Sequence, residues 1–475
     1  MQSISRRTFT RRSLVGLTAS VAALSSKPTL LWGDSAGHSR PTRLWVTSDT
    51  QRFAPVEAPK WKSGGGGAAD IEILPGKRFQ QVLGFGAAFT DASCYLISKM
   101  SAGGRGTLMD ALFGQKGLKL SVGRTCVGAS DYSRDVYSFD ESAQPDPELK
   151  HFSIEHDRAY ILPVLQEARK LNPELFLFST PWSPPGWMKA GGSMLGGSMR
   201  KEYMAAYAQY FVRFLQGYGS DGVKINAVTV QNEVDTDQNG RMPAALWGQE
   251  YEMEFVKTHL GPALERAGLD TKIWILDHNY NLWGRAIDEL SDPEVNKFVD
   301  GVAWHGYYGD TAAMTRVHDA FPDKHTYWTE GGPDISAPDY ATDWSKWSET
   351  FTGVLRNWAR CIVGWNYALD EKGNPNIGPF PCGGLVTIDS KTQKVIESGQ
   401  YWAFAHYSKA IQRNAQVVSS EGKVDGIHHV AVENPDGSRV LVLTNRGDAR
   451  TVRCTVASSA TEVHLAKNSI ATLVW

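Results

Sequence analysis

The sequence predicts an α/β fold, a (β/α)8 TIM barrel accompanied by an accessory antiparallel β-sandwich domain. Three observations predict it. Strand-like runs alternate with helix-like patterns over roughly 300 residues from Ile71 onward, which is typical of a parallel barrel. After about Ala415 only strand-like runs and turns remain. Finally, Glu233 and Glu330 each end a β-branched run, where a barrel carries its functional side chains.

The expected barrel strands are short runs rich in aliphatic, aromatic or β-branched residues. In chain order they are Gln81–Phe85, Leu118–Gly123, Leu175–Thr180, Ile225–Val230, Lys272–Asp277, Gly301–Trp304, His325–Thr329 and Cys361–Trp365. Helical patterns lie between several of them, at Glu202–Tyr218, Glu250–Ala267 and Thr352–Arg360.

The C-terminal region alternates apolar runs with turns such as Asn434-Pro-Asp-Gly437, which is typical of an antiparallel sandwich. Runs at Thr42–Val46 and Ile71–Leu74 could add strands to it and make the domain discontinuous. We therefore expect a linker with N-terminal sandwich strands at 37–75, the barrel at 76–410 and the remaining sandwich at 411–475.

Residues 1–36 have the features of a twin-arginine signal peptide. Ser5-Arg6-Arg7-Thr8-Phe9 is followed by an apolar stretch from Leu14 to Leu24, too short to span a bilayer. The alternatives are an uncleaved interfacial helix or a misassigned start. We expect export by the twin-arginine route to the periplasm or the medium, cleavage near Ala36, and no integral membrane segment.

Composition and motifs exclude several functional classes. The net charge of −2 leaves no basic surface for nucleic acid, so a neutral partner such as a carbohydrate is expected, and the 16 Trp residues suit sugar stacking. The five cysteines are odd in number and lack zinc-ligand spacing, which favours buried, unpaired thiols. No H-E-x-x-H or G-x-S-x-G occurs, and Phe89 replaces the third glycine of a dinucleotide loop. We expect no metal or organic cofactor to be required.

Glu233 and Glu330 stand 330 − 233 = 97 positions apart, at the ends of the fourth and seventh expected strands. In a closed barrel these strand ends face each other across the mouth. Retaining glycoside hydrolysis uses one carboxylate as nucleophile and another as acid/base, and Asn232 beside Glu233 could bind a sugar 2-hydroxyl. The alternative is that both glutamates are solvated loop residues, since Glu is rarely buried.

Several motifs resemble glycoside hydrolase family 30, the family of glucosylceramidase, from the first to the last barrel strand. They are Gly84-Phe-Gly-Ala-Ala-Phe-Thr-Asp91, Arg124 through Asp131-Tyr-Ser133, Ser179-Thr-Pro-Trp-Ser-Pro-Pro-Gly-Trp-Met-Lys189, Gln231-Asn-Glu233, His305-Gly-Tyr307, Thr329-Glu330 and Gly364-Trp-Asn-Tyr-Ala-Leu369.

The resemblance implies a role for each matching residue. Glu233 matches the acid/base, Glu330 the nucleophile and Asn232 the partner of the 2-hydroxyl. The terminal glucose would be held by Asp131, Trp182 and Trp365, and the carboxylates would be oriented by Arg124, His305 and Tyr307. Arg124 would keep Glu330 ionised, while the less compensated Glu233 stays protonated. The structural alternatives are core packing for both tryptophans, a satisfied core histidine for His305 and a loop cap for Asp131.

Two loops depart from the family pattern on the side of the leaving group. Gly331-Gly332-Pro333 differs from the segment that follows the nucleophile in animal glucosylceramidase, and Asp370–Cys382 is rich in Gly and Pro. The resemblance therefore implies a retaining, glucosylceramidase-like β-glycosidase acting on a carbohydrate or glycolipid. A β-1,6-glucanase of the same family is the alternative, and the family also contains β-xylosidases. A non-catalytic carbohydrate-binding protein is the alternative from another class.

Overall fold

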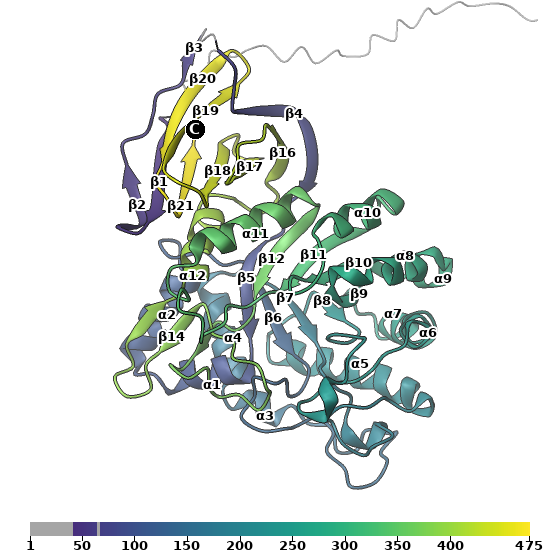
Figure 1. Cartoon of the computed structure of the whole chain (residues 1–475). Helices are drawn as coiled ribbons and strands as arrows, with labels where there is room; N and C mark the ends of the chain where they lie inside the picture. The colour runs from purple at the N-terminus through teal and green to yellow at the C-terminus, as the bar shows by residue number, and fades with distance from the viewer. Residues whose placement is uncertain (1–40, 64–66) are drawn as a thin grey trace, which may run out of the picture. The chain divides into compact units, whose positions relative to one another are not determined.

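Eight parallel strands close a barrel in the computed structural model, which describes residues 41–63 and 67–475 (Figure 1). The expected leader, 1–36, lies outside the described residues. The strands are β5 (Gly84–Phe89), β6 (Val122–Cys126), β7 (Phe176–Thr180), β8 (Ala227–Thr229), β9 (Lys272–Asn279), β10 (Val299–His305), β11 (His325–Glu330) and β12 (Ala359–Gly364). Every neighbouring pair is parallel, and β12 pairs with β5 to close the ring. The predicted barrel is confirmed.

The first two barrel strands begin later than the sequence pattern predicted. β5 runs from Gly84 rather than Gln81, because the preceding residues belong to β4 (Ile71–Gln81) of a different sheet. Its sequence, Gly-Phe-Gly-Ala-Ala-Phe, contains no β-branched residue, so propensity alone gives no signal for it. β6 likewise starts at Val122 rather than Leu118.

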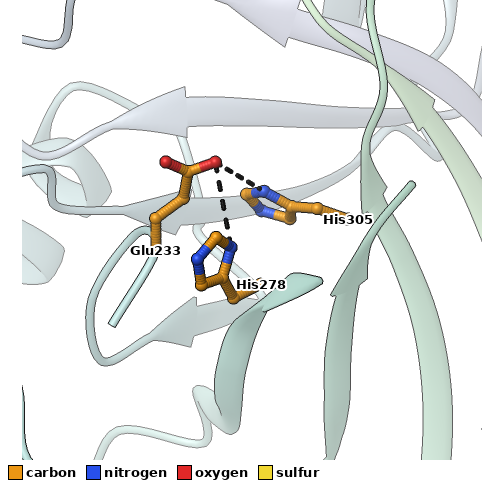
Figure 2. A group of neighbouring side chains, drawn as sticks. All are labelled: Glu233, His278 and His305. Atoms are coloured by element: carbon orange, nitrogen blue, oxygen red, sulfur yellow. Dashed lines mark ion pairs between the residues drawn. The ribbon is translucent and has the colours of Figure 1, made fainter. Parts of the chain in front are cut away.

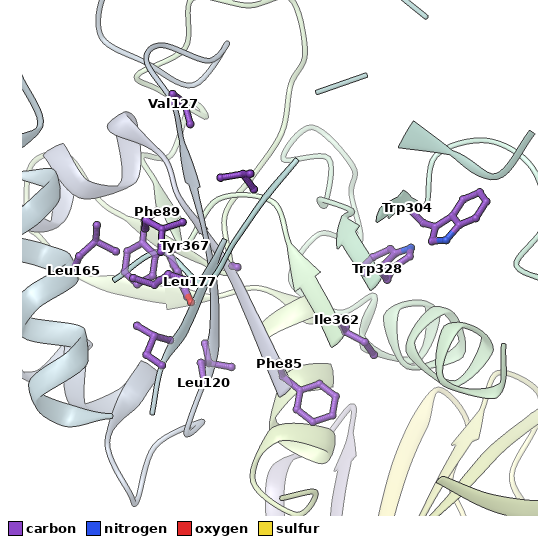
Figure 3. Close-up of a cluster of buried hydrophobic side chains, with 14 of the residues drawn as sticks. Phe85, Phe89, Leu120, Val127, Leu165, Leu177, Trp304, Trp328, Ile362 and Tyr367 are labelled. Carbon is purple, nitrogen blue, oxygen red and sulfur yellow. The ribbon is translucent and has the colours of Figure 1, made fainter. Parts of the chain in front are cut away.

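The barrel has two apolar layers. Inside it, buried side chains from β6 to β12 fill the interior, as in other closed barrels of eight strands. These residues are Val122, Phe178, Ala227, Trp274, Ala303, Tyr327, Cys361 and Val363. A larger cluster lies between strands and helices; Figure 3 shows Phe85, Leu165 and Trp328 among its members.

Helices follow the barrel strands along the chain. They are α1 (Asp91–Lys99), α2 (Ala102–Phe113), α3 (Glu155–Arg158), α4 (Ile161–Leu171), α5 (Met204–Ser220), α6 (Gln249–Glu254), α7 (Gly261–Arg266), α8 (Trp283–Ser291), α9 (Pro293–Asn296), α10 (Ala312–Ala320), α11 (Trp344–Arg356) and α12 (Gly399–Ser408). A π-helical turn, Phe255–Leu260, joins α6 to α7, so the expected helix at 250–267 is continuous but not uniform.

The predicted helix Thr352–Arg360 was wrong in its position. The observed helix, α11, spans Trp344–Arg356, and β12 already begins at Ala359. Trp344, Trp347 and Phe351 repeat at helical spacing and are buried, so the apolar pattern that defines the helix starts eight residues earlier than expected.

Ten further strands form one hydrogen-bonded sheet. They are β1 (Arg43–Ser48), β2 (Gln51–Val56), β3 (Lys62–Ser63), β4, β16 (Gln416–Glu421), β17 (Ile427–Glu433), β18 (Arg439–Asn445), β19 (Arg450–Val456), β20 (Ser459–Leu465) and β21 (Ser469–Val474). Leu44 of β1 and Val463 of β20 share one apolar core, although their strands stand near opposite ends of the sheet order. The sheet therefore folds over on itself, and N-terminal strands lie beside C-terminal ones (Figure 1).

Polar contacts join this sheet to the barrel helices. His406 of α12 is fully buried between Thr47 of β1 and Thr472 of β21, each 2.8 Å from one ring nitrogen. Burial lowers the pKa of His406 to about 3, so the imidazole is neutral there. A small sheet of β13 (Ala368–Leu369), β14 (Val386–Ile388) and β15 (Val395–Glu397) follows β12.

All five cysteines are unpaired; Cys382 is half-buried and the others are buried. None of the helices within 41–63 and 67–475 combines the length and the apolar character that crossing a membrane requires.

Candidate active site

A cavity of about 540 Å³ opens at the carboxyl ends of the barrel strands. Seven of the predicted site residues line it, contributed by the ends of different strands and the loops that follow them. They are Asp131, Trp182, Asn232, Glu233, Tyr307, Glu330 and Trp365. The two others, Arg124 and His305, are fully buried behind the cavity wall.

Glu330 is the last residue of β11 and is almost completely buried. Arg124 donates a hydrogen bond to Oε2, and the Tyr307 hydroxyl donates to Oε1 over 3.0 Å. Both oxygens of this carboxylate thus receive a donor, which fixes its orientation toward the cavity.

Arg124 connects the polar groups of the cavity wall. Besides Glu330, its guanidinium donates to Asn232 Oδ1 and to Asp277 Oδ2, each over 2.8 Å. The guanidinium carbon lies 4.6 Å from the ring centre of Trp182. A buried arginine is tolerated only when it is paired, and two carboxylates pair this one.

Asp277 was not among the predicted site residues, although the expected fifth strand ended on it. Its carboxylate accepts hydrogen bonds from Arg124, Thr180, Thr229 and Thr329 at 2.7–3.0 Å. Burial raises the pKa of Asp277, but the Arg124 charge, the contact with His305 and the Thr329 hydrogen bond outweigh it and lower the pKa far below the ordinary value.

A β-bulge places Asp277 behind the cavity and its neighbour His278 in the cavity lining. Leu276 pairs with Ala303, whereas the next residue of β10 pairs with His278, so Asp277 is the extra residue. Leu276 and Asp277 have φ of 73° and 45°, in the left-handed region. The bulge breaks the alternation of side chains and aims consecutive ones at the site.

Glu233 lies four residues beyond β8, with φ of 52°, rather than at the strand end that the sequence predicted. Its backbone N–H donates to the Asp277 carbonyl over 3.1 Å, which holds this turn against β9. Gln238 Nε2 donates to Oε2 over 2.8 Å, while Oε1 faces His305 and His278.

The expectation that Glu233 is protonated for lack of compensation was wrong for the free protein. Burial raises the pKa of Glu233, but His305, His278 and Gln238 favour the carboxylate and together bring the pKa below its usual value. Sequence reasoning missed His278 and Gln238. His278 could have been identified from the sequence, because it directly follows Asp277 at the end of a predicted strand.

His305 is the last residue of β10 and contacts three carboxylates. Its Nδ1 lies 3.5 Å from Glu233, and its Nε2 lies 3.1 Å from Asp277 and 3.8 Å from Glu330. Burial lowers the pKa of His305, but the Glu330 charge and the contacts with Asp277 and Glu233 raise it to about 9. A cationic imidazole therefore lies between the two predicted catalytic carboxylates.

The predicted sugar-binding residues form one wall of the cavity. Trp182 and Trp365 stack with ring centres 5.1 Å apart. Asp131 is buried, and its Oδ1 has no hydrogen-bond partner among the described residues. Burial and the charges of Glu330 and Glu233 raise the pKa of Asp131 well above its ordinary value.

The two loops that depart from the family pattern meet at the cavity rim. Ile335 N–H donates to the Pro381 carbonyl over 2.9 Å, and Gly383 N–H donates to Pro333 over 2.8 Å. Pro333, Phe380 and Pro381 line the cavity. These loops are therefore placed to contact whatever extends from the bound group.

Family models match both parts of the chain. The glycosyl hydrolase family 30 TIM-barrel domain matches residues 82–411, and the β-sandwich domain of the same family matches residues 414–473. The chain belongs to glycosyl hydrolase family 30. The resemblance inferred from the motifs is thereby confirmed, and the protein is a glycoside hydrolase.

Relatives of this family 30 hydrolase are named either as endo-1,6-β-glucanases or as glucosylceramidases. An endo-1,6-β-D-glucanase of Neurospora crassa is 33% identical over 395 residues, which cover 79% of this chain and 81% of the relative. The lysosomal acid glucosylceramidase of Mus musculus is 29% identical, covering 79% and 77%. A solved endo-β1,6-glucanase has a TM-score of 0.83 at 27% identity, covering 91% of this chain and 99% of its own.

Proposed function

We propose that this family 30 hydrolase is a retaining β-glycosidase that cleaves β-glucosides, with Glu330 as nucleophile and Glu233 as acid/base. The observation that carries the proposal is the contrast between two carboxylates on one cavity. Glu330 accepts hydrogen bonds from the Arg124 guanidinium and the Tyr307 hydroxyl, whereas Glu233 faces imidazoles and a side-chain amide.

In the first step, Glu330 attacks the anomeric carbon while Glu233 gives its proton to the departing glycosidic oxygen. A bound sugar excludes water from the cavity, which adds to the burial that already raises the pKa of Glu233 and lets this group enter the step protonated. In the second step, Glu233 takes a proton from water, whose oxygen displaces Glu330 and releases the sugar with its configuration retained.

The remaining cavity residues have roles in substrate binding. Arg124 donates to the Asn232 carbonyl oxygen, so the Asn232 amide N–H groups are available to a sugar hydroxyl. Asp131 offers its unpartnered Oδ1 to another hydroxyl, and Trp182 with Trp365 provides apolar surface for the C–H bonds of the ring.

Two leaving groups are supported by the relatives. The similarity to the Neurospora crassa enzyme and to the solved endo-β1,6-glucanase supports a β-1,6-linked glucan. The similarity to the Mus musculus enzyme supports glucosylceramide. Glucose released from glucosylceramide but not from the glucan would select the glycolipid, and short oligosaccharides from the glucan would select endo action.

The catalytic assignment is tested with an aryl β-glucoside. Glu330→Gln should abolish turnover, and Glu233→Gln should regain activity when azide is added as an external nucleophile. Glu202→Gln, which replaces an exposed glutamate, is the matched control and should keep wild-type activity. A first-formed α-anomer in proton NMR would refute retention.

We also propose export by the twin-arginine route to the periplasm or the medium, supported by Ser5-Arg6-Arg7-Thr8-Phe9 and the short apolar stretch behind it. Changing Arg6 and Arg7 to lysine should keep the protein in the cytoplasmic fraction. Unchanged export of that variant would contradict the route.

A further inference from the structure

Three side chains, one from the turn after β8 and two from the ends of β9 and β10, converge on one point (Figure 2). Glu233 Oε1 lies 3.5 Å from His305 Nδ1 and 3.8 Å from His278 Nδ1. One potential ligand atom from each of the three residues lies within 4.8 Å of the other two. The second carboxylate oxygen, Oε2, is held by Gln238 over 2.8 Å, which leaves Oε1 directed at the two rings.

The two imidazoles present an unpartnered nitrogen to this point. His278 Nδ1 and His305 Nδ1 are buried without a hydrogen-bond partner among the described residues. Both nitrogens face Glu233 Oε1 from farther than a good hydrogen bond, so a ligand that bonded all three atoms would satisfy them better than they satisfy one another.

The opposite nitrogen of each ring is held by a carboxylate. His305 Nε2 lies 3.1 Å from Asp277 Oδ1, and His278 Nε2 lies 2.5 Å from Asp235 Oδ1. An ionised carboxylate only accepts, so each Nε2 donates its proton. His305 is cationic in the free protein, so a metal ion that binds here takes the place of its Nδ1 proton, and both rings then offer the Nδ1 lone pair. This arrangement of carboxylate, histidine and ion orients histidine ligands in metal sites.

The distances suit a small ion after minor side-chain rotation. Metal–ligand bonds of about 2.0–2.1 Å in a tetrahedron place ligand atoms roughly 3.3 Å apart. Two imidazoles and one glutamate also form the ligand set of some zinc sites that keep an open position. Glu233 and His278 line the cavity, so an ion there could keep that position toward solvent.

The carboxylates around this point outnumber its two cationic groups, Arg124 and His305, so the excess negative charge favours a cation. Asp235 and Asp277 lie behind the two rings, and Glu330 lies 3.8 Å from His305 Nε2. Imidazole nitrogen with carboxylate oxygen prefers Zn²⁺ and neighbouring transition-metal ions over Mg²⁺ or Ca²⁺.

We propose that Glu233, His278 and His305 form a binding site for a divalent transition-metal ion such as Zn²⁺, and that the ion inhibits the enzyme by occupying the carboxylate that would donate the proton. The binding is independent of the proposed function, whereas the inhibition rests on it.

The binding is tested on the full chain after treatment with a chelator. Titration with Co²⁺ should give one equivalent of binding with the visible absorption of a low-coordinate site, and Zn²⁺ should displace the Co²⁺. His278→Gln should weaken binding at least tenfold, and Asp235→Asn should weaken it about tenfold by releasing the second ring. His464→Gln, which removes an exposed histidine on β20, is the matched control and should bind as the wild type does.

Each result bears on the proposal. Loss of the Co²⁺ band in His278→Gln but not in His464→Gln supports the site; equal binding by both variants, or no stoichiometric binding by the wild type, overturns it. If thermal unfolding shows that His278→Gln does not fold, Glu233→Gln takes its place, with the same two outcomes. Binding of Zn²⁺ without inhibition of aryl β-glucoside hydrolysis would leave the metal site standing and contradict the acid/base role of Glu233.

Discussion

At the residue scale, Asp277 supports the buried charges of the site. It pairs with Arg124, and neither side chain has any exposed surface. Asp277→Asn should destabilise the protein by about 3–5 kcal/mol at pH 7, because it leaves a buried guanidinium with one fewer anion. Asp270→Asn, which breaks the exposed pair with Lys224, should cost less than about 1 kcal/mol. Urea unfolding of both variants measures the difference.

The pH dependence of that difference has a defined sign. The folded-state pKa of Asp277 is depressed, so its contribution is present above the unfolded value of about 3.9 and is lost as pH falls below it. The stability gap between wild type and Asp277→Asn should therefore shrink below about pH 4. A gap that widens in acid would contradict the assignment of an ionised Asp277.

The same residues show what sequence could and could not predict at this scale. Glu330 was placed correctly because it ends a regular β-branched strand. Glu233 was expected at a strand end, yet it lies beyond the strand in a left-handed turn held by Asp277. The roles of Asp277 and His278 depend on the bulge in β9, which leaves no mark in the apolar pattern. The protonation of Glu233 could not be predicted, because it depends on His278 and Gln238, which only the fold brings close.

At the element scale, the contact of β5 with β6 depends on Gly86. A Cβ on Gly86 would lie 1.6 Å from the backbone oxygen of Val122 and 3.1 Å from the Tyr367 hydroxyl. Gly86→Ala should therefore destabilise the barrel by more than about 3 kcal/mol, because a backbone atom cannot move aside as a side chain does.

Gly106→Ala, inside α2 with no atom within 4 Å of the added carbon, should instead stabilise by about 1 kcal/mol. Thermal unfolding of the two variants should thus shift in opposite directions, and a Gly86→Ala barrel as stable as the wild type would contradict the packing of β5.

The apolar pattern predicted which elements exist better than where they begin. Eight barrel strands were expected and eight occur, because parallel strands buried on both faces are nearly continuous apolar runs. The predicted boundaries were wrong where the local sequence lacks the usual signal of its element. The glycine-rich β5 contains no β-branched residue, and α11 begins at Trp344, before the expected range. The pairing of β4 with β16 and β19 joins segments that are far apart in the chain, so no local sequence pattern predicts it.

At the scale of the whole molecule, barrel and sandwich share one apolar core. The cluster that holds Phe351 and Phe404 of the barrel helices also contains Val442 and Ile470 of the ten-stranded sheet. A break between the two domains would expose this surface to water. We therefore expect a single unfolding transition, in which tryptophan fluorescence and far-UV circular dichroism change together.

His406 makes this shared core sensitive to acid. Its ring is neutral in the fold, with a pKa of about 3, but it has a value of about 6.5 when unfolded. Its contribution to stability is present above about pH 6.5 and is lost as pH falls toward 3, because protons then bind the unfolded chain preferentially. The loss from this group should reach about 3 kcal/mol at pH 4.

His406→Gln can still hydrogen-bond both Thr47 and Thr472 but does not titrate, so its stability should fall less steeply between pH 6.5 and 4. His464→Gln should follow the wild-type curve. Parallel acid curves for wild type and His406→Gln would show that the interface does not carry this proton linkage.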